Sequence, residues 1–450
     1  MRAVLCAMLL PILGSAQELV LDAGFNSGSG LWGGFYDIAL LPDGRIVCGG
    51  SFESFDGISQ RGALRLTAEG EPDPTFAPQF APGDWNSVFG VALQNDGRVL
   101  LAGNFNEVNG SPALGLARVT ANGATDENFD HDIEGYFFSV AVADNGNVYA
   151  GGTLFNTGSG LVILDPYGAT AASVLADDAA DHLQTTPDGD ILCGGRFQGL
   201  NGNPGKLGRI SAAGVLDATL TVDVGPAVGT ISDVALQPDG RILISGSFAQ
   251  VDGMPRNNIA RLEADGSLDM SFVPGTGFDV QVNAIAVLPN GDILVGGPFT
   301  TYNEVVLNGN LVRLDASGAL ITSYQGASLI NDIAVQPDGK VLLCGGYLYF
   351  NGVLRKGIMR LMADPGTGLE SIASAVVALT YDALSDAVVL KDPASGYTAL
   401  TIRDMSGRTV LQVDHPSANG RIDVRHLPDG VYAVSSIEQG RPFYGRFLKH

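Results

Sequence analysis

Short apolar runs recur along most of the chain, and each ends at a turn signal instead of continuing with helical spacing. The run Asp233–Leu236 is followed by Pro238-Asp239-Gly240, and a β-branched run, Ile242–Phe248, begins directly after that turn. Apolar runs of this length, bounded by Gly, Pro, Asn and Asp, predict β-strands. No stretch shows the apolar spacing of an amphipathic helix, so the pattern predicts an all-β protein.

The same unit occurs seven times. The segment Leu41–Phe52 reappears as Gln94–Phe105 and again as Gln237–Phe248. The turn glycines that mark the seven copies are Gly44, Gly97, Gly146, Gly189, Gly240, Gly291 and Gly339. From Gly44 to Gly339 the chain advances 295 residues in six steps, which is about 49 residues per copy. This period is typical of a β-propeller blade.

Each copy predicts four strands. After the second strand, an Asp-Gly or Asn-Gly pair such as Asp252-Gly253 predicts a tight hairpin. The third strand carries an arginine between apolar residues, and Leu268–Phe272 is representative of the fourth. In the sixth copy Tyr302-Asn303-Glu304 replaces the glycine turn, so we expect a different turn there.

The recurring arginines have two interpretations. They are Arg65, Arg118, Arg209, Arg261, Arg313 and Arg360, and the third copy has Ile163 instead. Arranged around a ring, they could hold an anion. A residue repeated in nearly every blade more often performs the same internal task in each, here pairing with a carboxylate or capping carbonyls between blades. We favour the internal role.

The ends of the repeat region complement one another. The seventh copy stops after Leu361 without a fourth strand, whereas Leu21–Asn26 matches a fourth strand with no first three before it. We therefore expect the N-terminal segment to complete the last blade, which removes exposed sheet edges at the seam. The expected architecture is a seven-bladed β-propeller over residues 17–370, closed by an N-terminal strand.

Residues 1–16 have the features of a secretory signal peptide. Arg2 supplies the positive start, Val4–Leu13 an apolar core, and Gly14-Ser15-Ala16 small residues for cleavage before Gln17. No apolar run reaches the length of a transmembrane helix. Residues 371–450 lack the repeat and contain separated strand-like runs, for example Ala387–Leu390, which predict a small β-sandwich.

Two family resemblances follow from these motifs. The units over residues 19–362 resemble the delta-60 repeat of bacterial secreted proteins, which implies a propeller-like fold and extracellular use but no catalytic residues. The tail resembles the type A sorting domain of the type IX secretion system, through Asp404–Val410, Ile422–Val424, Leu427–Tyr432 and the basic ending Arg446–Lys449. Tyr381–Asp386 departs from the usual opening turn of that domain. The second resemblance implies export across a Bacteroidota-like envelope, with the secretion machinery as partner of residues 371–450.

Composition narrows the function classes. Charged residues make up only 16% of the chain, 61 residues are glycine, and the formal net charge is −23. A phosphate backbone would be repelled, so we expect no nucleic-acid partner. The three cysteines of the mature chain, Cys48, Cys193 and Cys344, lie in apolar strands, which favours buried free thiols over disulfides.

No catalytic chemistry stands out. The five histidines, His131, His182, His415, His426 and His450, have no metal-ligand spacing, and no serine has flanking glycines at −2 and +2. The Asp-Gly turns lack the alternating acids of a calcium loop. We assign no catalytic, cofactor-binding, metal or binding residue and expect no cofactor. The deviant copies, around Thr153–Leu161 and Tyr302–Leu307, are the best places to look for a binding site.

The sequence therefore predicts a secreted or cell-surface propeller that acts as a binding, adhesion or scaffold module for an extracellular glycan or protein, and not an enzyme. The alternative is an extracellular polysaccharide hydrolase or lyase whose paired carboxylates meet across the propeller mouth.

Overall fold

A computed structural model describes residues 18–26, 31–81, 86–155, 158–225, 229–325, 329–363, 379–382, 387–390, 399–404, 409–414, 421–428, 430–438 and 441–449. Two compact units divide the chain, one over Leu19–Met362 and one that includes Ala363–His450. The predicted signal peptide, residues 1–16, lies outside the described residues, as do parts of the predicted sorting motifs, such as residues 405–408. Every regular element in the described part is a β-strand.

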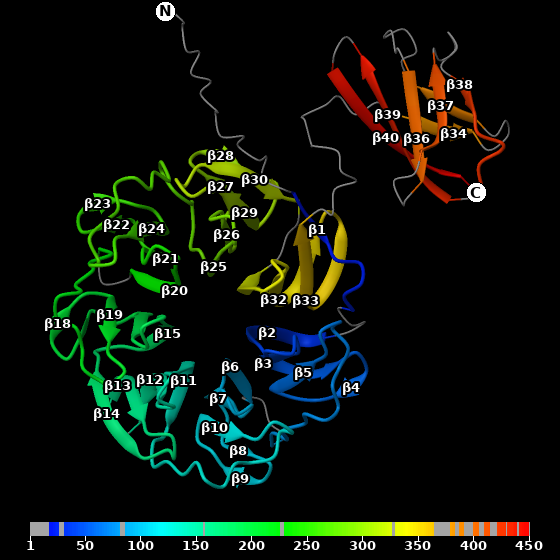
Figure 1. The fold of residues 1–450 in the computed structure, drawn as a ribbon. Helices are drawn as coiled ribbons and strands as arrows, with labels where there is room; N and C mark the ends of the chain where they lie inside the picture. The colour runs from blue at the N-terminus through cyan, green and yellow to red at the C-terminus, as the bar shows by residue number, and fades with distance from the viewer. Residues whose placement is uncertain are drawn as a thin grey trace, which may run out of the picture. The chain divides into compact units, whose positions relative to one another are not determined.

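The described residues of the first unit form seven blades around a common centre (Figure 1). The inner strands are β2 (Leu31–Leu40), β6 (Ser87–Leu93), β11 (Gly135–Val142), β15 (Ala180–Thr185), β20 (Thr230–Leu236), β25 (Ala284–Val287) and β31 (Ile330–Val335). The second strands are β3 (Ile46–Phe55), β7 (Val99–Asn104), β12 (Val148–Leu154), β16 (Ile191–Gly195), β21 (Ile242–Ser247), β26 (Ile293–Gly296) and β32 (Val341–Phe350). The third strands are β5 (Ala63–Leu66), β10 (Leu116–Val119), β13 (Gly158–Leu164), β19 (Leu207–Ile210), β24 (Ile259–Leu262), β29 (Leu311–Leu314) and β33 (Val353–Ala363). Neighbouring strands within a blade pair antiparallel, for example Val234 with Ile244 and Ile244 with Ala260.

Small hairpins extend most blades outward. Their strands are β4 (Ile58–Ser59), β8 (Glu107–Val108), β9 (Ser111–Pro112), β17 (Gly199–Leu200), β18 (Asn203–Pro204), β22 (Gln250–Val251), β23 (Met254–Pro255), β27 (Thr301–Tyr302) and β28 (Val305–Val306). The predicted Asp-Gly and Asn-Gly turns are confirmed, because both residues have positive φ, as in Asp252 (48°) and Gly253 (78°). The expectation of a different turn in the sixth copy is wrong. Asn303 (47°) and Glu304 (66°) adopt the same conformation, although Glu304 lacks the conformational freedom of glycine.

The predicted fourth strand is only partly formed. Regular fourth strands exist as β14 (Thr170–Leu175), β30 (Leu320–Tyr324) and β1 (Leu19–Leu21). In the fifth blade, Leu268 makes a single bridge to Leu262, and the chain then turns. The physical reason is Asp269, whose Oδ1 accepts the N–H of Ser271 at 2.7 Å and so bends the backbone out of the ladder.

The ring closes as the sequence predicts. Strand β1 pairs with β33 in the last blade, and the N–H of Asp22 donates to the carbonyl of Arg360 at 2.9 Å. The seven-bladed, all-β fold closed by an N-terminal strand is thereby confirmed. The hydrophobic core lies between blades: Phe35 and Cys48 of the first blade pack in one cluster with Cys344 of the seventh. The three predicted free thiols are buried and unpaired to one another, which confirms that prediction too.

The described residues of the C-terminal unit form two sheets, as the predicted small sandwich requires. One sheet contains β34 (Leu379–Asp382), β35 (Ala387–Leu390) and β38 (Arg421–Asp423). The other contains β37 (Thr409–Asp414), β36 (Ala399–Asp404), β39 (Gly430–Glu438) and β40 (Arg441–Lys449). Lys449 of the basic ending is buried, and its Nζ donates to the carbonyls of Val424 (2.9 Å) and Leu427 (2.7 Å). This lysine therefore holds its own unit together.

Candidate functional site

Six of the seven inner strands place one residue outside the regular pairing of their sheet. In β20, for example, the register shifts between Ile231 and Asp233, so Ser232 forms a β-bulge. The same shift occurs in β2, β6, β11, β15 and β31, and in the sixth blade Asn283 holds the corresponding position before β25. We call the seven residues the bulge ring: Tyr36, Phe89, Phe138, Asp181, Ser232, Asn283 and Asn331. A bulge re-aims a side chain without destroying the strand around it.

The bulge ring surrounds one end of a central cavity. This cavity has a volume of about 510 Å³ and is lined by residues of all seven inner strands. In each inner strand, the bulge residue is the first residue along the chain that lines it. Because every blade repeats the same strand order, the seven inner strands begin at the same end of the ring (Figure 1). We call that end the channel mouth.

Aromatic side chains occupy the mouth over three consecutive blades. The ring centroids of Tyr36 and Phe89 lie 5.5 Å apart, and those of Phe89 and Phe138 lie 5.6 Å apart. The Arg196 guanidinium carbon lies 4.9 Å from the centroid of Phe138, which continues the series into the fourth blade. Tyr36 is exposed and the two phenylalanines are half-buried, so this aromatic arc presents apolar surface to the cavity.

Polar side chains occupy the rest of the mouth. Arg196 donates two hydrogen bonds to Asp181, from Nη2 to Oδ1 at 2.9 Å and from Nε to Oδ2 at 3.0 Å. The Asn331 amide donates through Nδ2 to the carbonyl of Phe35 at 2.7 Å. Asn283 donates to the carbonyl of Ile330 at 3.2 Å. These bonds fix the polar groups in orientation, which reduces the entropy lost when a ligand binds.

The residue after each bulge has a structural task in most blades. Oδ2 of Asp37 accepts the N–H of Val91 in the next blade at 2.6 Å. Three equivalent hydrogen bonds join other pairs of neighbouring blades. Ser139 Oγ accepts the N–H of Leu183 (3.1 Å), Asp233 Oδ2 that of Ile285 (2.6 Å) and Asp332 Oδ2 that of Ile38 (3.1 Å). These side chains therefore join neighbouring inner strands around the channel.

Burial and mutual repulsion perturb the acids of the channel. Burial raises the pKa of Asp37 well above its usual range, and the negative charge of Asp332 beside it adds to the effect. Burial, together with the charge of Asp233, raises the pKa of Asp332 to about 6. The two carboxyl groups of Asp37 and Asp332 are hydrogen-bonded to each other, so the titration of each depends on the other.

A histidine side chain, that of His182, lies beside Asp233 in the same cavity. Nε2 of His182 lies 3.2 Å from Oδ1 of Asp233, an ion-pair distance without hydrogen-bond geometry. Burial raises the pKa of Asp233, and the nearby imidazole opposes that rise. Among the described residues, no group of three His, Cys, Asp or Glu side chains is arranged to hold a metal ion.

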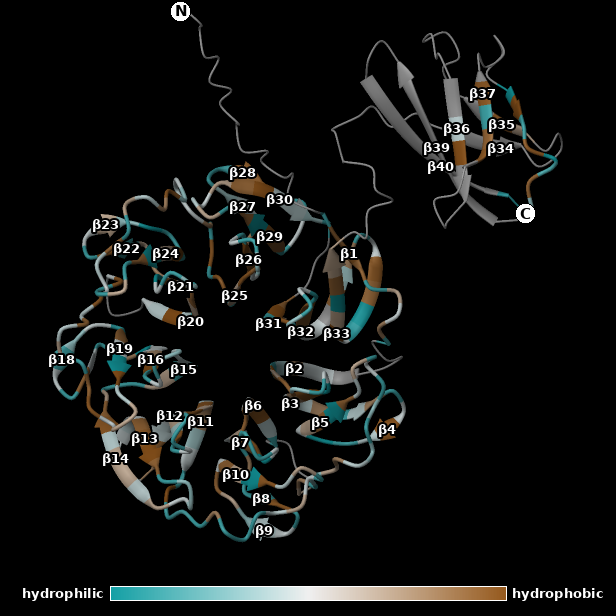
Figure 2. Cartoon of the chain, viewed as in Figure 1, coloured by the Kyte–Doolittle hydropathy of each residue, from teal (hydrophilic) through white to brown (hydrophobic). Residues whose placement is uncertain are grey.

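The recurring arginines are confirmed in their internal role. Arg261 donates from Nε to Oδ2 of Asp269 at 2.7 Å and from Nη1 to the carbonyl of Ala316 in the next blade, and its guanidinium lies over Phe272. The carboxylate partners of Arg65, Arg118 and Arg360 are Asp73, Asp126 and Asp22. Figure 2 shows the resulting hydrophilic segments in third strands such as β5 and β19. In the third blade, which has no such arginine, Asn145 Nδ2 donates to the carbonyl of Ala212 instead, at 3.1 Å.

The deviant copies do not join the channel mouth. In the third copy, Phe155 and Tyr136 are exposed and form an edge-to-face pair with centroids 4.9 Å apart. In the sixth, Val305 and Val306 of β28 are exposed. None of these four residues lines the central cavity. The prediction that the deviant copies would identify the site therefore missed the bulge ring.

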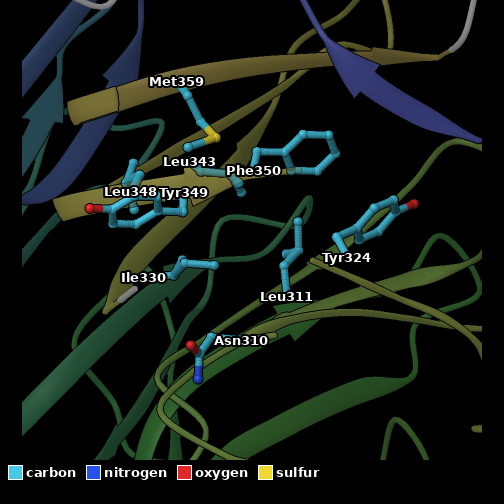
Figure 3. Close-up of a pocket in the computed structure, with 9 residues that line it drawn as sticks. All are labelled: Asn310, Leu311, Tyr324, Ile330, Leu343, Leu348, Tyr349, Phe350 and Met359. Carbon is cyan, nitrogen blue, oxygen red and sulfur yellow. The ribbon is translucent and has the colours of Figure 1, made fainter. Parts of the chain in front are cut away.

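A smaller hollow between the sixth and seventh blades holds no site. Its volume is about 10 Å³, and apolar side chains such as Leu311, Leu343 and Met359 converge on it (Figure 3). A space of this size accommodates one water molecule at most. It is a packing gap in the core between these two blades.

The fold and the cavity define the chain as a seven-bladed β-propeller with a polar and aromatic channel mouth. The profile of a β-propeller family described as a domain of unknown function (DUF5122) matches residues 41–76, 94–129, 237–272, 288–322 and 336–364. These five stretches correspond to five of the seven repeat copies. No curated protein matches the sequence significantly.

Solved structures share the fold at low sequence identity. The WD40 β-propeller domain of Doa1 is 13% identical with a TM-score of 0.50, over 78% of this chain and 99% of that one. The extracellular domain of the two-component system BT4673 from B. thetaiotaomicron is 13% identical with a TM-score of 0.47, over 96% of this chain and 58% of that one. PorZ of Porphyromonas gingivalis, titled a surface component of the type-IX secretion system, is 14% identical with a TM-score of 0.39, over 92% and 65%. At this identity the likeness concerns the fold alone.

Proposed function

We propose that the protein is an extracellular binding module that holds its ligand at the channel mouth. The supporting observation is the asymmetry of the bulge ring. The scaffold around it repeats from blade to blade, yet this position is aromatic in the first three blades and polar in the other four. A cavity of about 510 Å³ lies within the usual range of small-ligand sites. A position that varies while its surroundings repeat is suited to recognition.

Catalysis at the same place is the weaker candidate. The paired carboxylates that a hydrolase or lyase would need do meet, as Asp37 and Asp332. However, both accept backbone N–H groups from the next blade, and they are hydrogen-bonded to each other. A retaining glycosidase separates its two carboxyl groups by roughly 5 Å, and an inverting one by more. We therefore propose that these acids tie the ring together and that the protein is not an enzyme.

The proposed function includes export of the protein to the cell surface or the medium. The signal-like residues 1–16 and the sorting-like tail support a secreted or surface-displayed protein whose residues 371–450 engage the type IX secretion machinery. The two-sheet arrangement in the described part of the tail is compatible with a folded sorting domain. No helix in the described part of the chain is long and apolar enough to cross a membrane.

Binding at the mouth is tested by retention of envelope and culture-medium components on the immobilised full-length chain. Phe138→Ala removes one member of the aromatic arc, and we expect it to weaken retention about tenfold or more. Phe155→Ala removes an exposed aromatic residue that does not line the cavity and serves as the matched control. Equal retention by the two variants would contradict a site at the mouth.

Export is tested by mass spectrometry of the chain termini in periplasmic, surface and medium fractions. A chain that begins at Gln17, lies outside the outer membrane and lacks the region after about residue 371 would support the proposed route. An intact tail retained in the periplasm would contradict it.

A further inference from the structure

The chemistry of the channel mouth narrows the class of ligand, provided that the mouth is the binding site as proposed above. We infer that it binds a neutral saccharide unit, with one apolar ring face on the aromatic arc and its hydroxyl groups toward the polar half of the bulge ring. Two features of the mouth favour this ligand class. Aromatic and polar side chains occupy separate parts of the bulge ring, and its charged groups already interact with one another.

The aromatic arc fits the apolar face of a sugar ring. Tyr36, Phe89 and Phe138 follow one another at centroid spacings of 5.5 and 5.6 Å, with interplanar angles of 43° and 31°. All three side chains line the cavity, and they come from one side of the ring, since they belong to three consecutive blades. The C–H groups on one face of a pyranose ring form a flat apolar patch, which packs against aromatic faces of this kind. A quaternary ammonium ion would instead require rings on several sides of it.

The polar half offers groups that suit hydroxyls. The amide of Asn331 uses Nδ2 for the carbonyl of Phe35, which leaves the amide oxygen as its acceptor side. Asp181 lines the cavity, and Arg196, whose guanidinium lies beside Phe138, donates to it from Nε and Nη2 and so fixes its orientation. Neighbouring donors and acceptors in planar groups match the paired hydroxyls of a sugar, and each hydrogen bond adds orientation.

Charge compensation argues for a neutral ligand. Asp181 is neutralised by its two hydrogen bonds to Arg196. Burial raises the pKa of Asp37 well above its usual range and that of Asp332 to about 6, which reduces the negative charge that these two acids carry near neutral pH. The mouth therefore has no pair of open carboxylates for a basic peptide. An acidic polymer is disfavoured by the remaining carboxylates and by the net charge of −23.

The experiment is saturation-transfer difference NMR on the full-length protein with four probes. They are neutral gluco-oligosaccharides, neutral N-acetylglucosamine oligosaccharides, galacturonate oligosaccharides and a lysine-rich peptide. Isothermal titration then gives the affinity of each probe that responds. Phe89→Ala tests the centre of the aromatic arc, and Phe155→Ala is the matched control.

We expect at least one neutral oligosaccharide to bind, with the strongest saturation on ring C–H protons, and Phe89→Ala to lower its affinity about tenfold or more. Phe155→Ala should leave that affinity unchanged. Near-ultraviolet circular dichroism and thermal melts establish that both variants are folded. Tyr36→Ala is the second variant, because its exposed side chain can be removed with little effect on the core.

The remaining outcomes distinguish failure of the saccharide inference from failure of the proposed binding site. Binding of the lysine-rich peptide or the galacturonate probe that depends on Phe89, without neutral saccharide binding, would overturn the saccharide inference and leave the mouth as the binding site. Saccharide binding that is insensitive to both Phe89→Ala and Tyr36→Ala would overturn the assignment to the mouth. Absence of any response from the four probes would overturn the saccharide inference, while the retention experiment with Phe138→Ala decides the proposed function separately.

Discussion

The ring closure depends on one buried ion pair, which gives a quantitative prediction. Arg360 of β33 donates from Nε to Oδ2 of Asp22 at 2.8 Å, and the two side chains are 9% and 11% exposed. The guanidinium also bonds to the carbonyl of Ala68 in the first blade and lies over Phe25, with its carbon 4.6 Å from the ring centroid. Asp22→Asn keeps the shape of the side chain but removes its charge, so it leaves a buried cation without its partner.

The expected cost follows from breaking such a pair. Removal of one partner of a buried ion pair destabilises proteins by about 3–5 kcal/mol. The 344 residues from Leu19 to Met362 imply an unfolding entropy of about 0.7 kcal/mol per kelvin. Asp22→Asn should therefore lower the Tm of the propeller by roughly 4–7 °C.

Calorimetry and hydrogen exchange together measure this effect. Asp269→Asn breaks the equivalent pair in the fifth blade, where Arg261 and Asp269 are 5% and 3% exposed, so its loss of Tm should be similar. Only Asp22→Asn should accelerate amide exchange in β1 and β33, because only this pair lies at the seam. Asp338→Asn, in the exposed pair with Lys340 of the same blade, is the surface control and should cost less than about 1 kcal/mol. If Asp22→Asn behaved like Asp338→Asn, the buried pair would not be what secures the closing strand.

Three further predictions follow. The raised pKa values of Asp37 and Asp332 mean that the folded state keeps protons that the unfolded state releases, so the contribution of these acids to stability is full below about pH 3.8 and is lost as the pH rises through their folded-state pKa values, which is about 6 for Asp332. Asp37→Asn imitates the protonated acid and should flatten this decline, whereas an unchanged slope of Tm between pH 4 and 8 would contradict the raised pKa of Asp37. Glu304→Gly relieves a positive φ of 66° and should raise stability by up to about 1 kcal/mol in denaturant titrations, and no gain or a loss would show that the side chain makes compensating contacts. Burial raises the pKa of all three cysteine thiols, so a thiol reagent should label them only as the protein unfolds, and rapid labelling of the native protein would contradict their burial.

The sequence predicts the scaffold well because the scaffold is repeated. Asp-Gly turns and apolar runs recur in nearly every copy, and the unmatched ends at Leu21–Asn26 and Leu361 indicate the closure. The internal role of the recurring arginines could be predicted for the same reason. The fourth strand was over-predicted, because a side chain such as Asp269 competes for the backbone N–H groups that a ladder would need.

The sequence does not identify the candidate site, because the residue at the bulge-ring position changes from copy to copy. Ser232 precedes Asp233 in one copy, and Phe89 precedes Gly90 in another, so within a single copy nothing distinguishes this position from its neighbours. Nothing in a strand pattern places a β-bulge there, since the bulge depends on how the inner strand pairs with its neighbour. Alignment of the seven copies against one another would have revealed the change from aromatic to polar residues, but not that all seven surround one cavity.

The bulges have a consequence for how this protein can change. The side chain of a bulge residue can be replaced while the regular strand pairing on either side of it stays in place, so the mouth can vary while the blades remain constant. The six bulges and the corresponding Asn283 of the sixth blade provide one variable position per blade. A library randomised only at the bulge ring should retain a folded core in most members and yield variants selective for new ligands. The same property allows related chains to diverge in specificity by a few point mutations, with no change of architecture.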